Sequence, residues 1–175
     1  MSEVYEGIVF RSNDAAASGA FRGLTAPVPL RLVRLADGIF GVYRVATRSV
    51  PLDVEAMTSL AASLSEAVPA ATAVFYDNRC GVRAAATFRG GTLSAEFGEE
   101  DEWWAPLDDE GVPRRDVPPV PATDLDPDEE YGCVRTAIDV GLADLGVPSA
   151  VTCDTLKQAF CYGGSPVLDP EHPSE

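Results

Sequence analysis

Apolar residues recur along this chain with two periods, and these periods predict its secondary structure. The alternation is clearest at 92–97, where Leu93, Ala95 and Phe97 alternate with polar residues, as in a strand with one face in water. Asp37-Gly38 separates two apolar runs and predicts a hairpin with a type I′ turn. By these signals and by β-branched and aromatic content, strands are predicted at 4–10, 30–35, 39–45, 71–76, 82–88 and 92–97.

Apolar residues at helical spacing predict four helices. The strongest covers 54–67, with Asp53 as its N-cap and Pro69 just after its end. A short helix is predicted at 15–21 behind the capping segment 12–14. Two more are predicted near the end of the chain, at about 129–145 and from Thr152 to the glycines at 163–164.

The predicted order is β-α-β-β-α-β-β-β, followed by a connector and two helices. The first six elements have the order of a split βαβ, ferredoxin-like unit. We therefore predict an α+β fold with a mainly antiparallel sheet of about five to six strands. Two to four helices are expected, mostly on one face of this sheet. Residues 1–165 are predicted to form a single domain containing an acidic, Pro-rich connector at about 112–128, and residues 166–175 to form a disordered tail.

Charge is distributed very unevenly along the chain. Residues 1–90 contain eight acidic and nine basic residues, whereas residues 91–175 contain twenty acidic and four basic residues. The densest segment, 96–130, has fourteen acidic residues against Arg114 and Arg115. A formal net charge of −15 disfavours binding to nucleic-acid phosphates and to anionic membranes. It favours a basic partner, and salt adaptation is the alternative explanation.

Several kinds of catalytic or metal site are disfavoured by the residue types present. The only histidine, His172, lies in the predicted tail, which argues against histidine-based acid–base or triad catalysis. The sequence has neither a Walker A motif nor a G-x-G-x-x-G motif. The segment Asp124-x-Asp126-x-Asp128 resembles the start of a calcium loop, but Glu129 follows where an EF-hand requires glycine. No catalytic residue, metal ligand or cofactor is therefore assigned.

The four cysteines are far apart and form no C-x-x-C pair, which indicates reduced thiols. Cys153 lies in the first turn of the last predicted helix, where the helix dipole favours a thiolate. It also shares a face with Leu156 and Phe160, so we predict a buried small hydrophobic residue instead. Cys80 lies in a predicted turn with no neighbour in sequence that would activate it.

The strongest candidate for recognition is the tryptophan pair Trp103-Trp104, in a predicted short edge strand over 103–107. Adjacent strand residues point to opposite faces, so one ring can enter the core while the other meets solvent. Tryptophan is enriched in binding hot spots, and flanking acids would provide steering and a polar rim. The predicted partner-binding residues are Trp103, Trp104, Glu99, Glu100, Asp101, Glu102, Asp108, Asp109 and Glu110.

These observations favour a small acidic protein that captures a basic protein partner, as an immunity protein or an antitoxin does. One alternative is an enzyme that uses carboxylates or a divalent cation without histidine. Another is a structural or accessory subunit whose acidic surface serves solubility. The N-terminus lacks the basic residues of a signal peptide, and no apolar run approaches the roughly 18 residues of a membrane span. A cytoplasmic location is therefore expected.

Overall fold

The computed structural model describes residues 3–26, 29–44 and 52–172, and it describes side chains as far as Leu168. In chain order, the described elements are β1 (Val4–Arg11), α1 (Asp14–Arg22), β2 (Leu30–Ala36), β3 (Ile39–Arg44), α2 (Val54–Leu64), β4 (Ala71–Asp77), β5 (Val82–Arg89), β6 (Thr92–Phe97), the 3-10 helix η1 (Glu99–Asp101), β7 (Trp103–Pro106), β8 (Val120–Pro121), the 3-10 helix η2 (Ala122–Asp124), β9 (Tyr131–Arg135), α3 (Ala137–Asp144), α4 (Cys153–Phe160) and β10 (Val167–His172).

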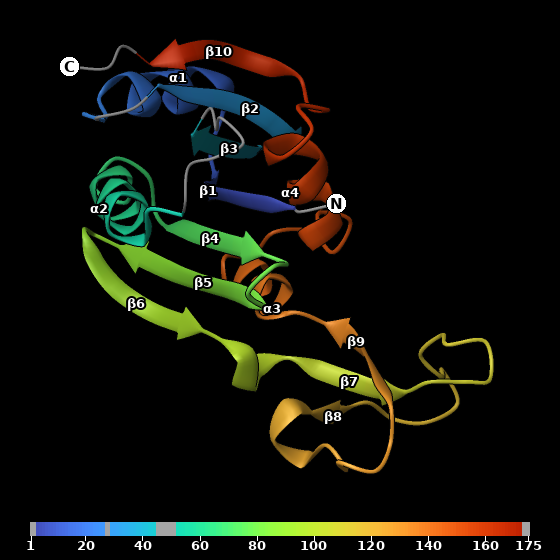
Figure 1. Cartoon of the computed structure of the whole chain (residues 1–175). Helices are drawn as coiled ribbons and strands as arrows, with labels where there is room; N and C mark the ends of the chain where they lie inside the picture. The colour runs from blue at the N-terminus through green and yellow to red at the C-terminus, as the bar shows by residue number, and fades with distance from the viewer. Residues whose placement is uncertain (1–2, 27–28, 45–51, 173–175) are drawn as a thin grey trace.

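The main sheet has seven antiparallel strands in the order β10-β2-β3-β1-β4-β5-β6 (Figure 1). The predicted α+β class is confirmed. Within the sheet, the order β2-β3-β1-β4 is the split βαβ arrangement expected from the first six elements. The sheet is larger than the predicted five to six strands. The meander β5–β6 extends it beyond β4, and β10 pairs with β2 at the opposite edge.

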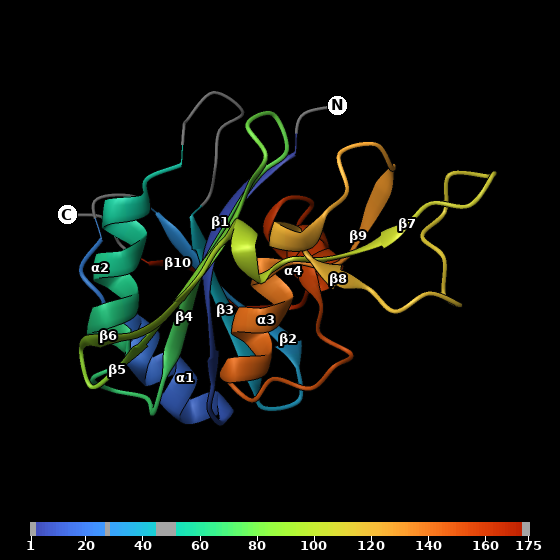
Figure 2. The same ribbon diagram turned by 90° about the horizontal axis from the view of Figure 1, so that it is seen from below.

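Helices cover both faces of the main sheet, so the prediction that they lie mostly on one face is wrong (Figure 2). Helices α1 and α2 pack on one face, where Phe21 and Leu60 belong to one core cluster. Helices α3 and α4 pack on the other face, where Ile138 and Leu156 belong to a second cluster. The physical reason is that β4 is buried along its whole length. A strand buried on both faces needs a layer on each side.

The ring of Phe160, near the end of α4, lies on two strand glycines. A Cβ atom added at Gly7 of β1 would lie 2.5 Å from this ring, and one added at Gly41 of β3 would lie 2.6 Å from it. The ring also contacts Tyr5 and stacks on Tyr43, with centroid separations of 6.1 and 5.3 Å. The absence of a side chain at both glycines therefore allows α4 to approach the sheet closely.

The strongest sequence patterns gave the correct local structure. Helix α1 begins after Asn13, and helix α2 begins after Asp53, each capped by the side chain of that residue. The β2–β3 hairpin forms at Asp37-Gly38, but its turn is not type I′. Among described residues only glycines have positive φ, so Asp37 lacks the conformation that a type I′ turn requires. A register shift between Arg34 and Ala36 accommodates the turn instead.

The last third of the chain differs most from the sequence expectations. The predicted helix 129–145 is strand β9 followed by the shorter helix α3, because Thr136 caps α3 in a reciprocal capping box with Asp139. Residues 167–172 of the predicted disordered tail form the edge strand β10, because they pair with β2. Residues 173–175 of that tail lie outside the described residues. Strand β7 is not an edge strand, since it lies between β8 and β9.

Strands β8, β7 and β9 form a second, three-stranded antiparallel sheet, which projects from the main body (Figure 1). We call residues 99–135 the projecting sheet. It includes the whole predicted Pro-rich connector at 112–128, and an isolated bridge joins Pro113 of that connector to Leu107. In the described part of the chain, no helix is long and apolar enough to cross a bilayer.

Candidate functional site

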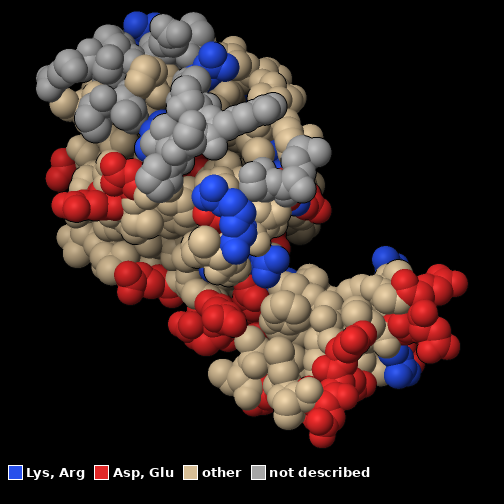
Figure 3. Space-filling model, in the orientation of Figure 1, with Lys and Arg blue, Asp and Glu red and all other residues tan. Residues whose placement is uncertain are grey.

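Of the fourteen acidic residues in segment 96–130, all except Glu96 of β6 lie on the projecting sheet. Red side chains are concentrated there in the space-filling view (Figure 3). Eleven acidic residues of this sheet are exposed, and these are Glu99, Glu100, Asp108, Asp109, Glu110, Asp116, Asp124, Asp126, Asp128, Glu129 and Glu130. Among described residues, only Asp116 of these eleven forms an ion pair, and its partner is Arg114. The projecting sheet therefore carries a large negative charge that its own cations do not neutralise.

The two tryptophans differ in exposure, in agreement with their alternation along strand β7. The side chain of Trp103 is 39% exposed. Trp104 is half-buried and lies opposite Cys133 of β9 and Val120 of β8. Its indole Nε1 is buried and has no hydrogen-bond partner among the described residues. Trp103 is therefore the tryptophan that can contact a partner, whereas Trp104 packs within the protein.

Glu102 is not available to a partner, unlike the other glutamates of the predicted set. It is only 3% exposed, and its carboxylate lies 3.7 Å from the guanidinium group of Arg83 on β5. Burial raises the pKa of Glu102, and the charge of Arg83 opposes this rise. This ion pair connects the start of the projecting sheet to the main sheet. The role of Glu102 is therefore structural.

Two other predicted residues use their carboxylates to shape the backbone. Asp101 accepts a hydrogen bond from the backbone N–H of Gly98 at 3.0 Å and closes the turn of η1. Asp108 accepts hydrogen bonds from the backbone N–H groups of Glu110 and Val112, both at 2.9 Å. Asp108 remains exposed while it does so. From the predicted set, Glu99, Glu100, Asp109 and Glu110 are thus the exposed acids for which no such hydrogen bond is present among described residues.

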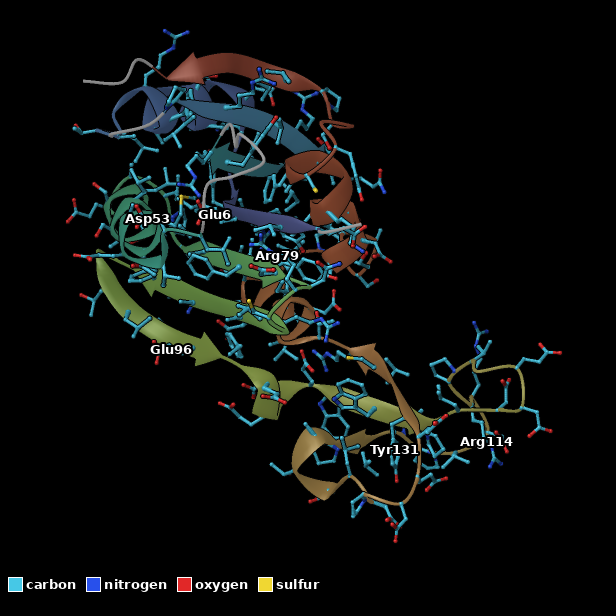
Figure 4. All side chains as sticks on the ribbon, viewed as in Figure 1. Glu6, Asp53, Arg79, Glu96, Arg114 and Tyr131 are labelled. Carbon is cyan, nitrogen blue, oxygen red and sulfur yellow. The ribbon has the colours of Figure 1, made fainter. Side chains whose placement is uncertain are left out.

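The acids after β8 extend the same surface toward β9. Figure 4 shows Arg114 and Tyr131 both on the projecting sheet, and the hydroxyl of Tyr131 donates a hydrogen bond to Glu129 at 3.2 Å. Asp126 accepts a hydrogen bond from the backbone N–H of Asp128 at 2.9 Å, which forms a local turn. Within the described residues, no three His, Cys, Asp or Glu side chains form a group that could hold a metal ion.

Burial makes two of the four cysteine thiols, those of Cys153 and Cys133, less acidic. Cys153 is buried, as predicted, and its sulfur lies 3.1 Å from the Tyr5 hydroxyl. Burial raises the pKa of Cys153, and it raises that of Cys133 to about 11. Both thiols are therefore protonated at neutral pH, and neither is an activated nucleophile. Cys80 is exposed, and Cys161 is partly exposed.

A polar cluster at the starts of α3 and α4 was missed by sequence reasoning. The carboxylate of Asp139 accepts a hydrogen bond from the Thr136 backbone N–H at 3.2 Å and from the Cys153 backbone N–H at 2.8 Å. Asp139 therefore satisfies backbone donors at the N-termini of both helices. Residues from the starts of both helices also line a cavity of about 290 Å³. In the sequence, the capping box formed by Thr136 and Asp139 could have indicated this cluster. It was not recognised because a single helix was predicted over 129–145.

Comparisons with known proteins gave no match, whether with family models, with curated proteins or with solved structures. The function is therefore argued from the residues and geometry of the chain alone.

Proposed function

We propose that the protein is a binding module that captures a basic protein partner on its projecting sheet. The observation that carries this proposal is the set of eleven exposed acids, of which only Asp116 has a cationic partner among described residues. An uncompensated field of one sign accelerates encounter with a partner of opposite charge. Salt adaptation explains the pattern less well, because residues 1–90 are nearly neutral.

Trp103 provides the apolar contact that a purely electrostatic surface lacks. It is exposed on the central strand of the projecting sheet, and Val134 of the neighbouring strand β9 is 47% exposed. Interfaces combine buried aromatic anchors with a polar rim. On the neighbouring strands Trp103 lies opposite Pro121 and Arg135, and the exposed acids lie elsewhere on the same projecting sheet. We propose Trp103 as the anchor and the exposed acids as the rim.

An immunity or antitoxin role fits this proposal. A toxin domain that acts on nucleic acid is commonly basic, and an acidic binding protein would neutralise it through complementary charge. Rapid association, which complementary charge promotes, is what such neutralisation requires. The proposed partner is therefore a basic domain whose own surface matches the projecting sheet.

Substitution of the proposed anchor tests this function. Affinity capture from a lysate of the source at low salt is expected to enrich a basic protein that high salt releases. With that partner purified, Trp103→Ala is expected to raise the dissociation rate about thirtyfold, which corresponds to a hot-spot contribution of about 2 kcal/mol. Surface plasmon resonance measures this rate.

Leu93→Ala is the matched control, because Leu93 is 45% exposed on β6, outside the projecting sheet. It is expected to leave the dissociation rate unchanged. If no basic protein is captured at low salt, or if Trp103→Ala behaves like Leu93→Ala, the proposed binding surface is wrong.

A further inference from the structure

A cavity of about 650 Å³ lies at the end of the main sheet, away from the projecting sheet's acids. Its walls come from the ends of β1 and β5, the β2–β3 turn and the segment that follows α3. The volume lies within the range of about 300–1,000 Å³ that is typical of sites for small molecules. Two of its lining residues are arginines, Arg11 and Arg89, in a chain with a net charge of −15.

The strand register places these two arginines on either side of a small residue. Phe10, Ala71 and Phe88 form one row across β1, β4 and β5, and they point toward the α1–α2 core. Successive strand residues point to opposite faces, so Arg11 and Arg89 of the next row point toward α3. Their Cα atoms are two strand spacings apart, or about 10 Å. Ala70 lies between them and leaves the space above it open.

The two guanidinium groups differ in their hydrogen-bond and ion-pair partners. Arg89 donates to the hydroxyl of Ser94 at 2.7 Å and to the backbone carbonyl of Asp144 at 3.3 Å, with the Asp144 carboxylate 3.4 Å away. Arg11 is exposed and forms no ion pair with any described acid. Its guanidinium passes 2.9 Å from the position that a Cβ atom of Gly146 would occupy. The positively charged side of the cavity thus retains hydrogen-bond donors for a ligand.

We propose that this cavity binds a small organic molecule through a phosphate or carboxylate group held between Arg11 and Arg89. Guanidinium groups form paired, charge-assisted hydrogen bonds with both kinds of oxyanion. The Ser12 residue also lines the cavity and supplies a hydroxyl group. Among the described residues that line the cavity, Asp37 is the one acid, and it lies in the turn whose Gly38 carbonyl accepts a hydrogen bond from the Ser12 backbone N–H at 3.0 Å.

The rest of the ligand is expected to be compact and apolar. The cavity is much larger than a free phosphate ion, and its remaining walls include Ile39, Leu145 and Pro148. Pockets that bind small molecules are typically mostly apolar, with a few polar groups that fix the orientation of the ligand. Phenyl phosphate and benzoate are therefore suitable probes, and benzyl alcohol is their uncharged counterpart.

Isothermal titration calorimetry of the full chain with these three probes tests the proposal. At least one anion is expected to bind saturably with a one-to-one stoichiometry, while benzyl alcohol does not. The anion that binds more tightly identifies the natural head group as phosphate or carboxylate. Arg11→Gln is expected to weaken this binding about tenfold or more, because a charge-assisted hydrogen bond contributes about 1.5–3 kcal/mol.

Arg115→Gln is the matched control, since it removes one exposed arginine from the projecting sheet and changes the net charge equally. It is expected to leave the affinity unchanged. Arg89→Gln provides a second test at the other side of the cavity, with the melting temperature measured to confirm folding. The proposal is overturned if neither anion saturates, or if Arg11→Gln and Arg89→Gln weaken binding no more than Arg115→Gln does.

Discussion

Phe160→Ala is expected to lower the free energy of unfolding by about 3–5 kcal/mol, the range for loss of a buried phenylalanine. The ring is 6% exposed and fills the space above Gly7 and Gly41, with Tyr5 and Tyr43 beside it. The two glycines below the ring contribute no side chain that could refill this space. Urea denaturation followed by circular dichroism measures the loss.

A double-mutant cycle separates this packing from a general effect of α4. Gly41→Ala alone is expected to destabilise the protein by about 1–3 kcal/mol, because its Cβ would lie 2.6 Å from the Phe160 ring. In the Phe160→Ala background, the same Gly41→Ala change should cost much less, since the ring is absent and the remaining close atom is the Leu35 Cδ1, 3.2 Å from the added Cβ. Additive effects of the two substitutions would contradict the packing described for Phe160 and Gly41.

Arg44→Met is expected to destabilise the protein by about 3–5 kcal/mol, because it leaves a buried carboxylate without its cation. Arg44 and Glu6 are 9% and 4% exposed, and their charged groups are 2.5 Å apart. The second carboxylate oxygen of Glu6 accepts a hydrogen bond from the Asp53 backbone N–H at 2.8 Å, and Figure 4 shows both residues beside the start of α2. The pair therefore connects β1 and β3 to the cap of α2.

The pH dependence of Arg44→Met provides an independent check. Burial already raises the pKa of Glu6, and the charge of Arg44 opposes that rise. Removing Arg44 raises the pKa further, so protonation of Glu6 stabilises the folded variant. The destabilisation should accordingly shrink as the pH falls through this raised pKa, and grow as the pH rises.

The double variant Glu6→Gln with Arg44→Met serves as the control. It removes both charges, so much of the lost stability should return and the pH dependence of this site should disappear. Equal destabilisation of the single and double variants at neutral pH would show that the ion pair is not the source of the effect.

Local sequence patterns predicted most of the main sheet. The Asp37-Gly38 hairpin, the helix capped by Asp53 and the three-stranded meander all depend on contacts within about thirty residues, and such contacts leave periodic signals. The split βαβ order followed from these elements. The second helical layer did not, because the two-sided burial of β4 is visible only once α3 and α4 pack against it.

The candidate site was predicted in outline but not in its details. The concentration of acid and the alternation of the two tryptophans could be seen in the sequence. The burial of Glu102 could not, because its partner Arg83 is nineteen positions away on another strand. Likewise, Tyr131–Arg135 becomes a strand through pairing with β7 rather than through its own pattern. The Arg11–Arg89 cavity required the register of three strands, which the sequence does not specify.

The association rate of the captured partner tests the central claim most directly. A triple variant of the projecting sheet, Glu100→Gln, Asp109→Asn and Glu110→Gln, is compared with a triple variant of the main body, Glu55→Gln, Glu66→Gln and Asp154→Asn. All six acids are exposed, and each variant changes the net charge equally. Stopped-flow tryptophan fluorescence measures both rates at low and at high salt.

The projecting-sheet variant is expected to associate about tenfold more slowly than the unaltered protein at low salt, while the main-body variant stays within about twofold. At high salt the difference should disappear, because the Debye length falls to about 3 Å at 1 M. Equal slowing of both variants, or no slowing of either, would contradict capture of a basic partner by the projecting sheet.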